Sequence, residues 1–380
     1  METNKIYCGN SLDILKTFED SSIDCCITSP PYYGLRDYGT GKWLGGDPNC
    51  PHKRLNKVGK HTSTGHAQEE LAGNVGDSIY KSVCPLCGAV RVDDQVGLEE
   101  TPEEYINKLV EIFREVKRVL KEDGTLWVNI GDSYASTNSN NRNFIDEGGR
   151  GGNNPNITTR TLPNDIKPKD LIGIPWMLAF ALRADGWYLR QDIIWHKTNP
   201  MPESVKDRCT KSHEYIFLLS KSPRYYFDYE AIREVASEQH ITNSIKFGGE
   251  KYGDDIDTPR IYSGSEYVPK SDFNGVLIRQ KRDVWDIPTS SFKEAHFATF
   301  PKELVRNCLL SGCPIGGVVI DPFMGSGTVG VVAKENHRKY VGIDLNPKYV
   351  ELANDRISGM LEFKNAHEVC DNQIKTQSLW

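Results

Sequence analysis

Gly317-Val-Val-Ile-Asp321 runs into Pro322-Phe-Met-Gly-Ser-Gly-Thr-Val-Gly330, and Tyr340-Val-Gly-Ile-Asp344 follows; these residues decide the fold. The two short apolar runs predict buried strands, and the glycine-rich stretch between them predicts a turn that opens a helix. A strand, a turn, a helix and a second strand in this order form a parallel crossover unit. A chain of 380 residues has room to repeat such units, so we expect an α/β fold.

The glycine turn is also a candidate ligand site. Gly325 and Gly327 let the backbone turn sharply and approach a ligand closely. With Gly330 they also satisfy the dinucleotide-binding pattern, so the glycines alone do not identify the ligand. Asp344, after the second strand, can accept hydrogen bonds from ribose hydroxyls. Asp321 would repel a pyrophosphate but could attract the sulfonium and amino group of S-adenosylmethionine.

A second turn, Ser29-Pro30-Pro31-Tyr32, follows the apolar run Ile23-Asp-Cys-Cys-Ile-Thr28. Two prolines cannot continue a strand, so the chain must turn here. The Ser29 hydroxyl and a main-chain carbonyl could accept hydrogen bonds from an exocyclic amino group and free its lone pair for attack on a methyl group. Tyr32 could stack on a base that has left the duplex. Taken alone, the segment is equally consistent with a structural turn.

Together the two turns resemble the motifs of the amino-group DNA methyltransferases. Ile27-Thr-Ser-Pro-Pro-Tyr32 is similar to the family's catalytic motif, and Asp321-Pro-Phe-Met-Gly-Ser-Gly-Thr328 to its cofactor motif. Their order resembles the permuted class, in which the target-recognition region lies between them. Three further segments are similar to lesser motifs of the family: Asn10-Ser-Leu-Asp-Ile-Leu15, Thr125-Leu-Trp-Val-Asn-Ile130 and Phe300-Pro-Lys-Glu-Leu-Val305. The resemblance implies a doubly wound, mostly parallel sheet of the Rossmann-like methyltransferase type in a single domain.

The resemblance also implies the residues of the active site. The target base would be held by Ser29, Pro30, Pro31 and Tyr32. S-adenosylmethionine would be bound by Phe300, Pro301, Asp321, Phe323, Gly325, Ser326, Gly327, Thr328 and Asp344. Within this set, Asp344 would bind the ribose, and Phe300 with Pro301 would close over the adenosyl group.

Serine at the first catalytic position resembles the branch that methylates N4 of cytosine, with N6 of adenine as the alternative. Methylation at C5 of cytosine needs a cysteine nucleophile, which in that family follows a proline. Cys50, Cys84 and Cys313 precede a proline instead. Two other classes remain open: a nucleotide-dependent oxidoreductase built on the glycine pattern, and a zinc-containing DNA-binding protein without activity.

Residues 41–97 form a polar insertion that we expect to contain a zinc knuckle. Cys50-Pro-His52 and Cys84-Pro-Leu-Cys87 are two short chelating pairs, and a Cys-x-x-Cys pair followed by glycine suits tetrahedral zinc. His61 and His66 are competing ligands, and free thiols are the alternative. A structural zinc ion would explain how so polar an insertion folds.

The remaining sequence predicts further core elements and two irregular regions. Thr101, Pro102 and Glu104 predict a capped helix that Gly124 can end. Core strands are expected at Thr125–Ile130, Tyr188–Trp195 and Glu214–Ser220, and helices at Pro175–Ala184 and Pro301–Leu310. Residues 135–169 are expected to form a flexible loop, and residues 230–285 a small target-recognition region.

Charge and composition limit the partners and the location. The net charge of −6 disfavours nucleic-acid binding by the whole chain, but residues 197–224 and Arg279, Lys281 and Arg282 are locally basic. No apolar run approaches the roughly 20 residues of a membrane span, and the N-terminus lacks a signal-peptide core. We therefore expect a cytoplasmic monomer or homodimer that acts on double-stranded DNA, with a cognate restriction endonuclease as a possible partner and no membrane contact.

Overall fold

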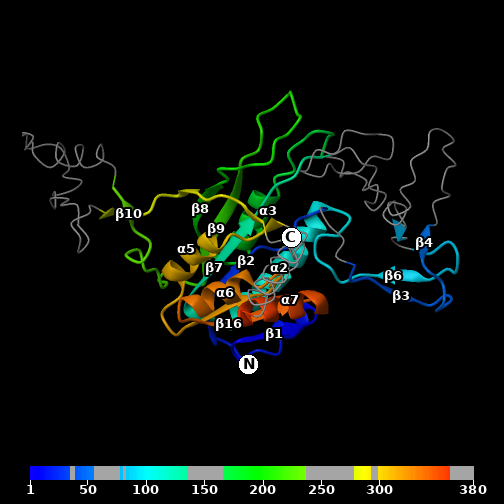
Figure 1. The fold of residues 1–380 in the computed structure, drawn as a ribbon, viewed down its shortest axis with the longest axis horizontal. Helices are drawn as coiled ribbons and strands as arrows, with labels where there is room; N and C mark the ends of the chain where they lie inside the picture. Colours follow the sequence, from blue (N-terminus) through cyan, green and yellow to red (C-terminus); the bar gives the residue numbers. More distant parts are fainter. Residues whose placement is uncertain are drawn as a thin grey trace, which may run out of the picture.

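The central sheet of the computed structural model is built from the predicted strands. The structure describes residues 1–34, 39–54, 78–79, 83–135, 166–236, 278–291 and 298–359. Within these ranges an eight-stranded sheet has the order β1-β16-β15-β2-β7-β9-β8-β12 (Figure 1). Its strands are β1 (Lys5–Cys8), β2 (Ile23–Thr28), β7 (Leu120–Ile130), β8 (Tyr188–His196), β9 (His213–Ser220), β12 (Val284–Asp286), β15 (Val318–Asp321) and β16 (Lys339–Asp344). Only β9 runs antiparallel to its neighbours, so the predicted mostly parallel sheet is confirmed.

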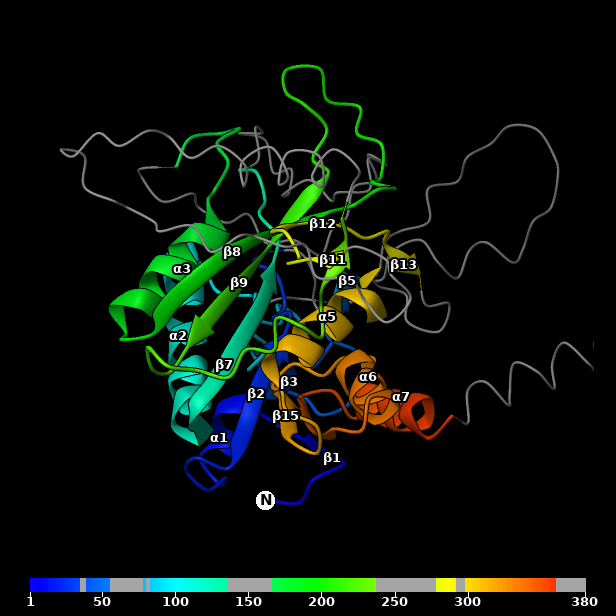
Figure 2. The same ribbon diagram turned by 90° about the vertical axis from the view of Figure 1, so that its left-hand side faces the viewer.

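Helices cover both faces of this sheet (Figure 2). One face carries α1 (Ser11–Leu15), α2 (Pro102–Val119) and α3 (Ile174–Ala184), and the other carries α5 (Lys302–Gly312), α6 (Thr328–Glu335) and α7 (Pro347–Ser358). The strands supply side chains to both layers: Cys26 packs in the core under α2, and Cys25 and Ile27 pack in the core under α5. This two-sided burial explains why the strands read as continuous apolar runs.

Helix α2 begins as predicted but ends earlier. Thr101 and Glu104 form a complete capping box at its start. The predicted end at Gly124 is wrong, because the helix stops at Val119 and β7 starts at the next residue. Leu120 is fully buried and pairs with Ile23 of β2, so its place in the sheet ends the helix. Gly124 lies inside β7 instead.

The two motif-bearing strands are direct neighbours. Val319 and Ile320 of β15 pair with Cys25 and Cys26 of β2 in parallel register. From β15 the chain continues to β16 on one side, and from β2 it continues to β7 on the other. The sheet therefore reverses its winding between β15 and β2, at the position where open α/β sheets bind ligands. Both motif turns leave the carboxyl ends of these strands.

The strand predicted at Glu214–Ser220 is confirmed as β9. Its direction decides at which edge of the sheet its first residues lie. It lies between β7 and β8 and runs antiparallel to both. Its first residues therefore reach the same edge of the sheet as the last residues of β2, β7 and β8.

Outside the central sheet the described residues form four small antiparallel pairs. These are β3 (Lys42–Leu44) with β6 (Val90–Val92), β4 (Lys53–Arg54) with β5 (Ser78–Ile79), β10 (Glu234–Val235) with β11 (Ile278–Arg279), and β13 (Ser290–Ser291) with β14 (Ala298–Thr299). Most of the expected loop 135–169 and of the expected recognition region 230–285 lies outside the described residues. Across the described ranges, none of the helices combines the length and the apolar character needed to cross a membrane.

Candidate active site

A cavity of about 380 Å³ lies at the carboxyl edge of the sheet, where the two motif turns meet. Its size suits a small organic ligand. The cavity is lined by these residues of the sequence-predicted site: Ser29, Pro30, Pro31, Tyr32, Phe300, Asp321, Phe323, Gly325, Ser326, Thr328 and Asp344. The structure thus brings the two turns into one site.

Pro301 and Gly327 do not line the cavity. Pro301 is the extended residue that precedes α5, and its carbonyl accepts the first hydrogen bond of that helix from Val305. Gly327 precedes α6 with φ of 79°, and a Cβ atom there would lie 2.8 Å from the Cβ of Ala353 in α7. The second glycine of the motif therefore serves the packing of α6 against α7, and only Gly325 faces the cavity.

Asp344 holds the glycine turn in place. Its carboxylate accepts hydrogen bonds from the backbone N–H of Gly325 at 2.8 Å and of Asn346 at 2.9 Å. Burial raises the pKa of Asp344 to about 6, although these hydrogen bonds act in the opposite direction. The carboxylate keeps acceptor capacity toward the cavity, as recognition of a hydroxyl group requires.

Asp321 is a buried carboxylate at the centre of the site. It accepts hydrogen bonds from the Thr28 hydroxyl at 2.6 Å and from the Phe323 N–H at 3.0 Å. Burial, assisted by the nearby Asp344, raises the pKa of Asp321 to about 7. A positively charged ligand in the cavity would favour the ionised form, so Asp321 suits a cation-binding role.

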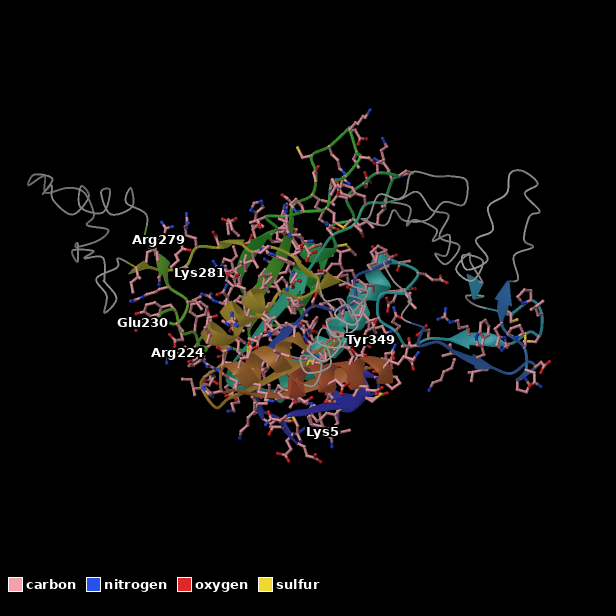
Figure 3. The ribbon with its side chains drawn as sticks, in the orientation of Figure 1. Lys5, Arg224, Glu230, Arg279, Lys281 and Tyr349 are labelled. Atoms are coloured by element: carbon pink, nitrogen blue, oxygen red, sulfur yellow. The ribbon has the colours of Figure 1, made fainter. Side chains whose placement is uncertain are left out.

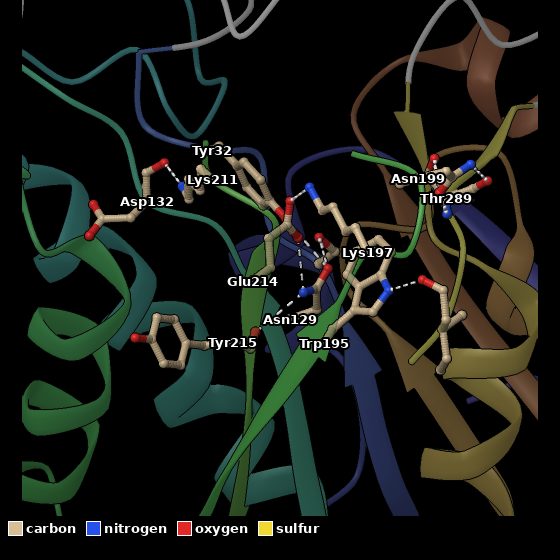
Figure 4. A network of polar contacts seen from close by, with 12 residues as sticks. Tyr32, Asn129, Asp132, Trp195, Lys197, Asn199, Lys211, Glu214, Tyr215 and Thr289 are labelled. Atoms are coloured by element: carbon tan, nitrogen blue, oxygen red, sulfur yellow. Dashed lines mark hydrogen bonds and ion pairs between the residues drawn. The ribbon is translucent and has the colours of Figure 1, made fainter. Parts of the chain in front are cut away.

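The other half of the cavity contains a network of polar side chains (Figure 4). Glu214 accepts hydrogen bonds from the Tyr32 hydroxyl at 2.6 Å and from the Asn129 amide at 3.1 Å, and it forms an ion pair of 2.6 Å with Lys197. The Ser29 hydroxyl donates a longer hydrogen bond of 3.4 Å to the Asn129 Oδ1 atom. The Ser29-Pro-Pro-Tyr turn is thereby joined to three neighbouring strand ends.

Sequence reasoning missed Asn129, Lys197 and Glu214 as site residues. Asn129 lies near the end of β7, Lys197 directly follows β8, and Glu214 is the second residue of β9. Burial raises the pKa of Glu214, but the Lys197 charge and the hydrogen bonds outweigh it and lower that pKa overall. A glutamate near the start of a mostly apolar strand was the signal in the sequence, but it does not tell at which edge of the sheet that strand starts.

Trp195 adds an aromatic surface to this half of the cavity. It lines the cavity near the end of β8, and the Lys197 ammonium lies 5.2 Å from the centre of its ring. Its indole N–H donates a hydrogen bond to the Ile287 carbonyl at 2.8 Å, which holds the ring in place. The cavity therefore combines aromatic faces with hydrogen-bonding groups, as a site for a planar base requires.

The four predicted metal ligands also come together, away from the cavity. The ligand atoms of Cys50, His52, Cys84 and Cys87 all lie within 4.8 Å of one another. The Cys50 and Cys84 sulfurs are 3.7 Å apart, and the Cys87 sulfur lies 3.6 Å from the His52 Nδ1 atom. In a tetrahedral site with Zn–S bonds of about 2.3 Å, ligand atoms lie about 3.5–3.8 Å apart. The geometry fits zinc; His61 and His66 fall outside the described residues.

The loop around these ligands has the form of a knuckle. The Cys84 N–H donates to the Ala89 carbonyl and the Gly88 N–H to the Cys84 carbonyl, each at 2.8 Å. Gly88 has a φ of 74°, which favours glycine at this position. The Trp43 ring stacks on His52 with ring centres 4.4 Å apart. The cluster therefore has a preformed support on the β3–β6 ribbon.

The basic cluster near β11 is engaged in local contacts. Arg279 and Arg282 both form ion pairs of 2.8 Å with Glu234, and the Lys281 ammonium lies 5.5 Å from the centre of the Trp285 ring. Figure 3 shows Arg279 and Lys281 on the flank of the molecule opposite the β3–β6 ribbon. Because Glu234 neutralises part of the cluster, its positive charge is weaker than the sequence suggests.

Comparisons with known proteins agree with this site. Residues 23–355 match the model of the N6 and N4 class of methylases, described as DNA methylase. The chain is 40% identical over 354 residues to the type II methyltransferase M.Cfr9I of Citrobacter freundii. The alignment covers 93% of this chain and 87% of M.Cfr9I. It is 39% identical over 353 residues to the type II methyltransferase M.SmaI of Serratia marcescens. That alignment covers 93% of this chain and 90% of M.SmaI.

A solved structure shares the fold. The PvuII DNA methyltransferase, described as cytosine-N4-specific, aligns with a TM-score of 0.51 at 15% sequence identity. The alignment covers 94% of this chain and 91% of that one. At this identity the likeness concerns the architecture alone.

Proposed function

The chain belongs to the DNA methylase family that modifies exocyclic amino nitrogens, and on this premise we propose that it transfers a methyl group from S-adenosylmethionine to N4 of cytosine. Membership in this family removes the oxidoreductase that the sequence left open, and the intact Ser29, Tyr32, Gly325 and Gly327 speak against the inactive DNA-binding protein. One observation carries the proposal: the Ser29-Pro-Pro-Tyr turn and the Asp321 turn line the same cavity.

We propose that the methyl donor occupies the part of the cavity between Asp321 and Asp344. Asp321 would attract the charged sulfonium and amino group, and Asp344 would accept hydrogen bonds from the ribose. Phe300 and Phe323 line the same cavity and offer faces for the adenine ring. A buried carboxylate, Asp321, and a partly buried one, Asp344, both have raised pKa values; this supports a positively charged ligand, since such a ligand would offset the cost of ionising them.

The base half of the cavity has the donor and acceptor pattern of an amino base. Ser29 and Asn129 present oxygen acceptors, and Lys197 presents an ammonium donor. Cytosine and adenine place an amino group beside a ring nitrogen that accepts, which complements this set. Thymine has no amino group, and the Watson–Crick edge of guanine places its amino group beside a ring N–H that donates, so neither complements this set. Tyr32 and Trp195 line the same cavity and offer aromatic faces to a flipped base.

The reaction itself requires little of the protein beyond positioning. S-adenosylmethionine supplies an electrophilic methyl group on a positively charged sulfur. The lone pair of the base's amino nitrogen forms the new C–N bond, while the pair of the C–S bond stays on sulfur. The nitrogen then loses one hydrogen as a proton to water. By accepting a hydrogen bond from the amino group, Ser29 would help to localise its lone pair.

Ser29 is the residue that favours cytosine, because serine at this position resembles the cytosine-N4 branch of the family. Mass spectrometry of nucleosides from DNA incubated with the protein and S-adenosylmethionine tests the proposal. We expect N4-methylcytosine, and reactions without the donor provide the control. N6-methyladenine would instead support the alternative, and unmodified DNA would contradict both.

We also propose that Cys50, His52, Cys84 and Cys87 hold a structural zinc ion. The interatomic distances within the cluster support this, and so does the small apolar content of the insertion at residues 41–97. The β3–β6 ribbon leads from the cluster toward residues 94–96, which line the cavity. Zinc would therefore stabilise a wall of the active site without taking part in the reaction.

Two further assignments follow from the family. The relatives are named type II methyltransferases, so we propose that this chain modifies the recognition site of a partner endonuclease. We propose that residues 230–285 take part in reading that site. Restriction of modified and unmodified DNA by a crude extract of the source cells would test the first assignment.

A further inference from the structure

The orientation of the Asn129 side chain is determined by two acceptors. The Nδ2 atom of Asn129 lies 3.1 Å from a Glu214 carboxylate oxygen and 3.2 Å from the Tyr215 carbonyl oxygen. An ionised carboxylate and a carbonyl can only accept, so the amide must turn its NH₂ group toward them. Its Oδ1 atom then faces the hydroxyl groups of Ser29 and Tyr32, each at 3.4 Å.

Glu214 can impose this orientation because it is ionised and held from several sides. The residue is only 6% exposed, and a buried carboxylate without a partner would take up a proton. The Lys197 ammonium at 2.6 Å supplies the opposite charge. The Tyr32 hydroxyl donates a further hydrogen bond of 2.6 Å to the oxygen that accepts from Asn129.

We propose that Glu214, paired with Lys197, is a positioning residue for methyl transfer that fixes the Asn129 amide with its oxygen toward Ser29. The inference rests on the proposed function of the site. With this orientation the Ser29 hydroxyl donates its hydrogen to Asn129, and its own oxygen stays free to accept from the amino group of the base. The reversed amide would direct its NH₂ group at Ser29 and compete with the base for that oxygen.

The placement of the network supports a role in the reaction. Asn129, Lys197 and Glu214 all line the cavity, and each lies at the carboxyl edge of the sheet. An ion pair that only stabilised the fold would not need to contact both Tyr32 and the partner of Ser29. The antiparallel direction of β9 is what brings Glu214 to this edge.

The first test is Glu214→Gln, which keeps the size of the side chain. The new amide can donate as well as accept, so only the Tyr215 carbonyl still requires the NH₂ group of Asn129 and its orientation is less strictly fixed. We expect kcat for methyl transfer to DNA to fall about 10- to 100-fold, while the affinity for S-adenosylmethionine measured by calorimetry stays within about twofold. Unchanged kcat, or an equal loss of donor affinity, would overturn the proposal.

A second variant, Glu214→Asp, tests the proposal in case Glu214→Gln does not fold. Glu214→Asp keeps the negative charge that neutralises Lys197, but its carboxylate is one methylene group shorter. It should fold and still lose kcat, since the contacts with Asn129 and Tyr32 lengthen. Wild-type kcat in a folded Glu214→Asp protein would count against the proposal.

The third test exchanges the hydrogen-bond donor, the Asn129 amide, with the acceptor, the Glu214 carboxylate. Asn129→Asp alone sets two carboxylates against each other, and we expect it to be nearly inactive. Combined with Glu214→Gln, the new amide can donate to the new carboxylate, and an oxygen again faces Ser29. We expect the double variant to be about tenfold more active than Asn129→Asp. A double variant no better than Asn129→Asp would refute the orientation mechanism.

Glu335→Gln is the matched control. Glu335 forms ion pairs with Lys302 and Arg306 on the surface of α5 and α6, outside the cavity, so the same change should leave kcat unaltered. The wild-type reaction separates the two hypotheses. If the wild type methylates DNA and Glu214→Gln does so equally well, only this inference fails. If the wild type methylates no DNA, the proposed function fails and this inference with it.

Discussion

Thr28 donates a hydrogen bond of 2.6 Å from its hydroxyl to the carboxylate of Asp321. The two residues are the last of β2 and the last of β15, and both are buried. Each directly precedes one of the two motif turns. This contact therefore links the turn that we assign to the base directly with the turn that we assign to the methyl donor.

The affinity for S-adenosylmethionine should depend on pH through Asp321. The pKa of Asp321 is about 7 without ligand, and a cationic ligand prefers the ionised form. Affinity should therefore rise from pH 5.5 to pH 7.5, by up to about tenfold per pH unit, and then level off. Asp344, with a pKa of about 6, acts in the same direction at lower pH. Calorimetry across this range provides the measurement; a flat profile would contradict the assigned role of Asp321.

Asp321→Asn should abolish donor binding but stabilise the free protein above pH 7. The pKa of this carboxyl is higher in the folded than in the unfolded state, so its contribution to stability falls as pH rises from about 4 to 7. Removing it should raise the free energy of unfolding at pH 8 by about 2–4 kcal/mol. Urea denaturation without ligand at pH 4 and pH 8 would show the gain at pH 8 only. A loss of stability at pH 8 would argue against the buried charge.

Ser29→Ala should lower kcat by about 100-fold and leave donor affinity nearly unchanged, since it removes one acceptor from the amino group. Steady-state methylation of DNA with a tritiated donor measures kcat, and calorimetry measures the donor affinity. Ser358→Ala, a serine on the exposed end of α7, is the control. If Ser29→Ala transfers methyl groups at the wild-type rate, the catalytic assignment is wrong.

Elemental analysis should find about one zinc ion per chain. Chelation or Cys87→Ser should lower the melting temperature and the rate of methylation together, because the cluster supports a wall of the cavity. Cys209→Ser, at an exposed cysteine outside the cluster, should change neither. A fully active, metal-free preparation would rule out the zinc site.

Gly327→Ala should cost about 2–5 kcal/mol of stability, because it combines a φ of 79° with a Cβ atom 2.8 Å from Ala353. Gly316→Ala is the matched control: its φ is 77°, but nothing lies within 4 Å of the added atom. It should cost only about 1–2 kcal/mol. Thermal unfolding of both variants separates the packing contribution from the backbone strain, and equal losses would mean that the contact with Ala353 is unimportant.

The sequence predicted the two halves of the site because each motif is contiguous. An apolar strand followed by Ser29-Pro-Pro-Tyr or by the glycine turn predicts both the element and the residues at its end. These strands are also neighbours, as the general rule for ligand sites in open α/β sheets would have it, since β2 pairs with β15.

The polar network could not be predicted in the same way. An apolar strand such as β9 has the same pattern in either direction, so the sequence did not reveal that Glu214 starts at the active edge. The role of Gly327 could not be predicted either. A ligand that approaches the backbone closely and a helix that packs against it closely both require glycine at that position. Only the position of Ala353 in α7 separates the two explanations.

The order of strands in the sheet also has a consequence for synthesis on the ribosome. β1 and β2 are consecutive in the chain, but β16 and β15 lie between them in the sheet. The residues joined by the Thr28–Asp321 contact are 293 positions apart. A nascent chain thus carries the turn assigned to the base long before that assigned to the methyl donor, and one side of β2 stays unpaired until β15 emerges. A chain cut short before β15 would be inactive toward DNA and would expose an aggregation-prone strand edge, so incomplete synthesis cannot leave a partly active enzyme.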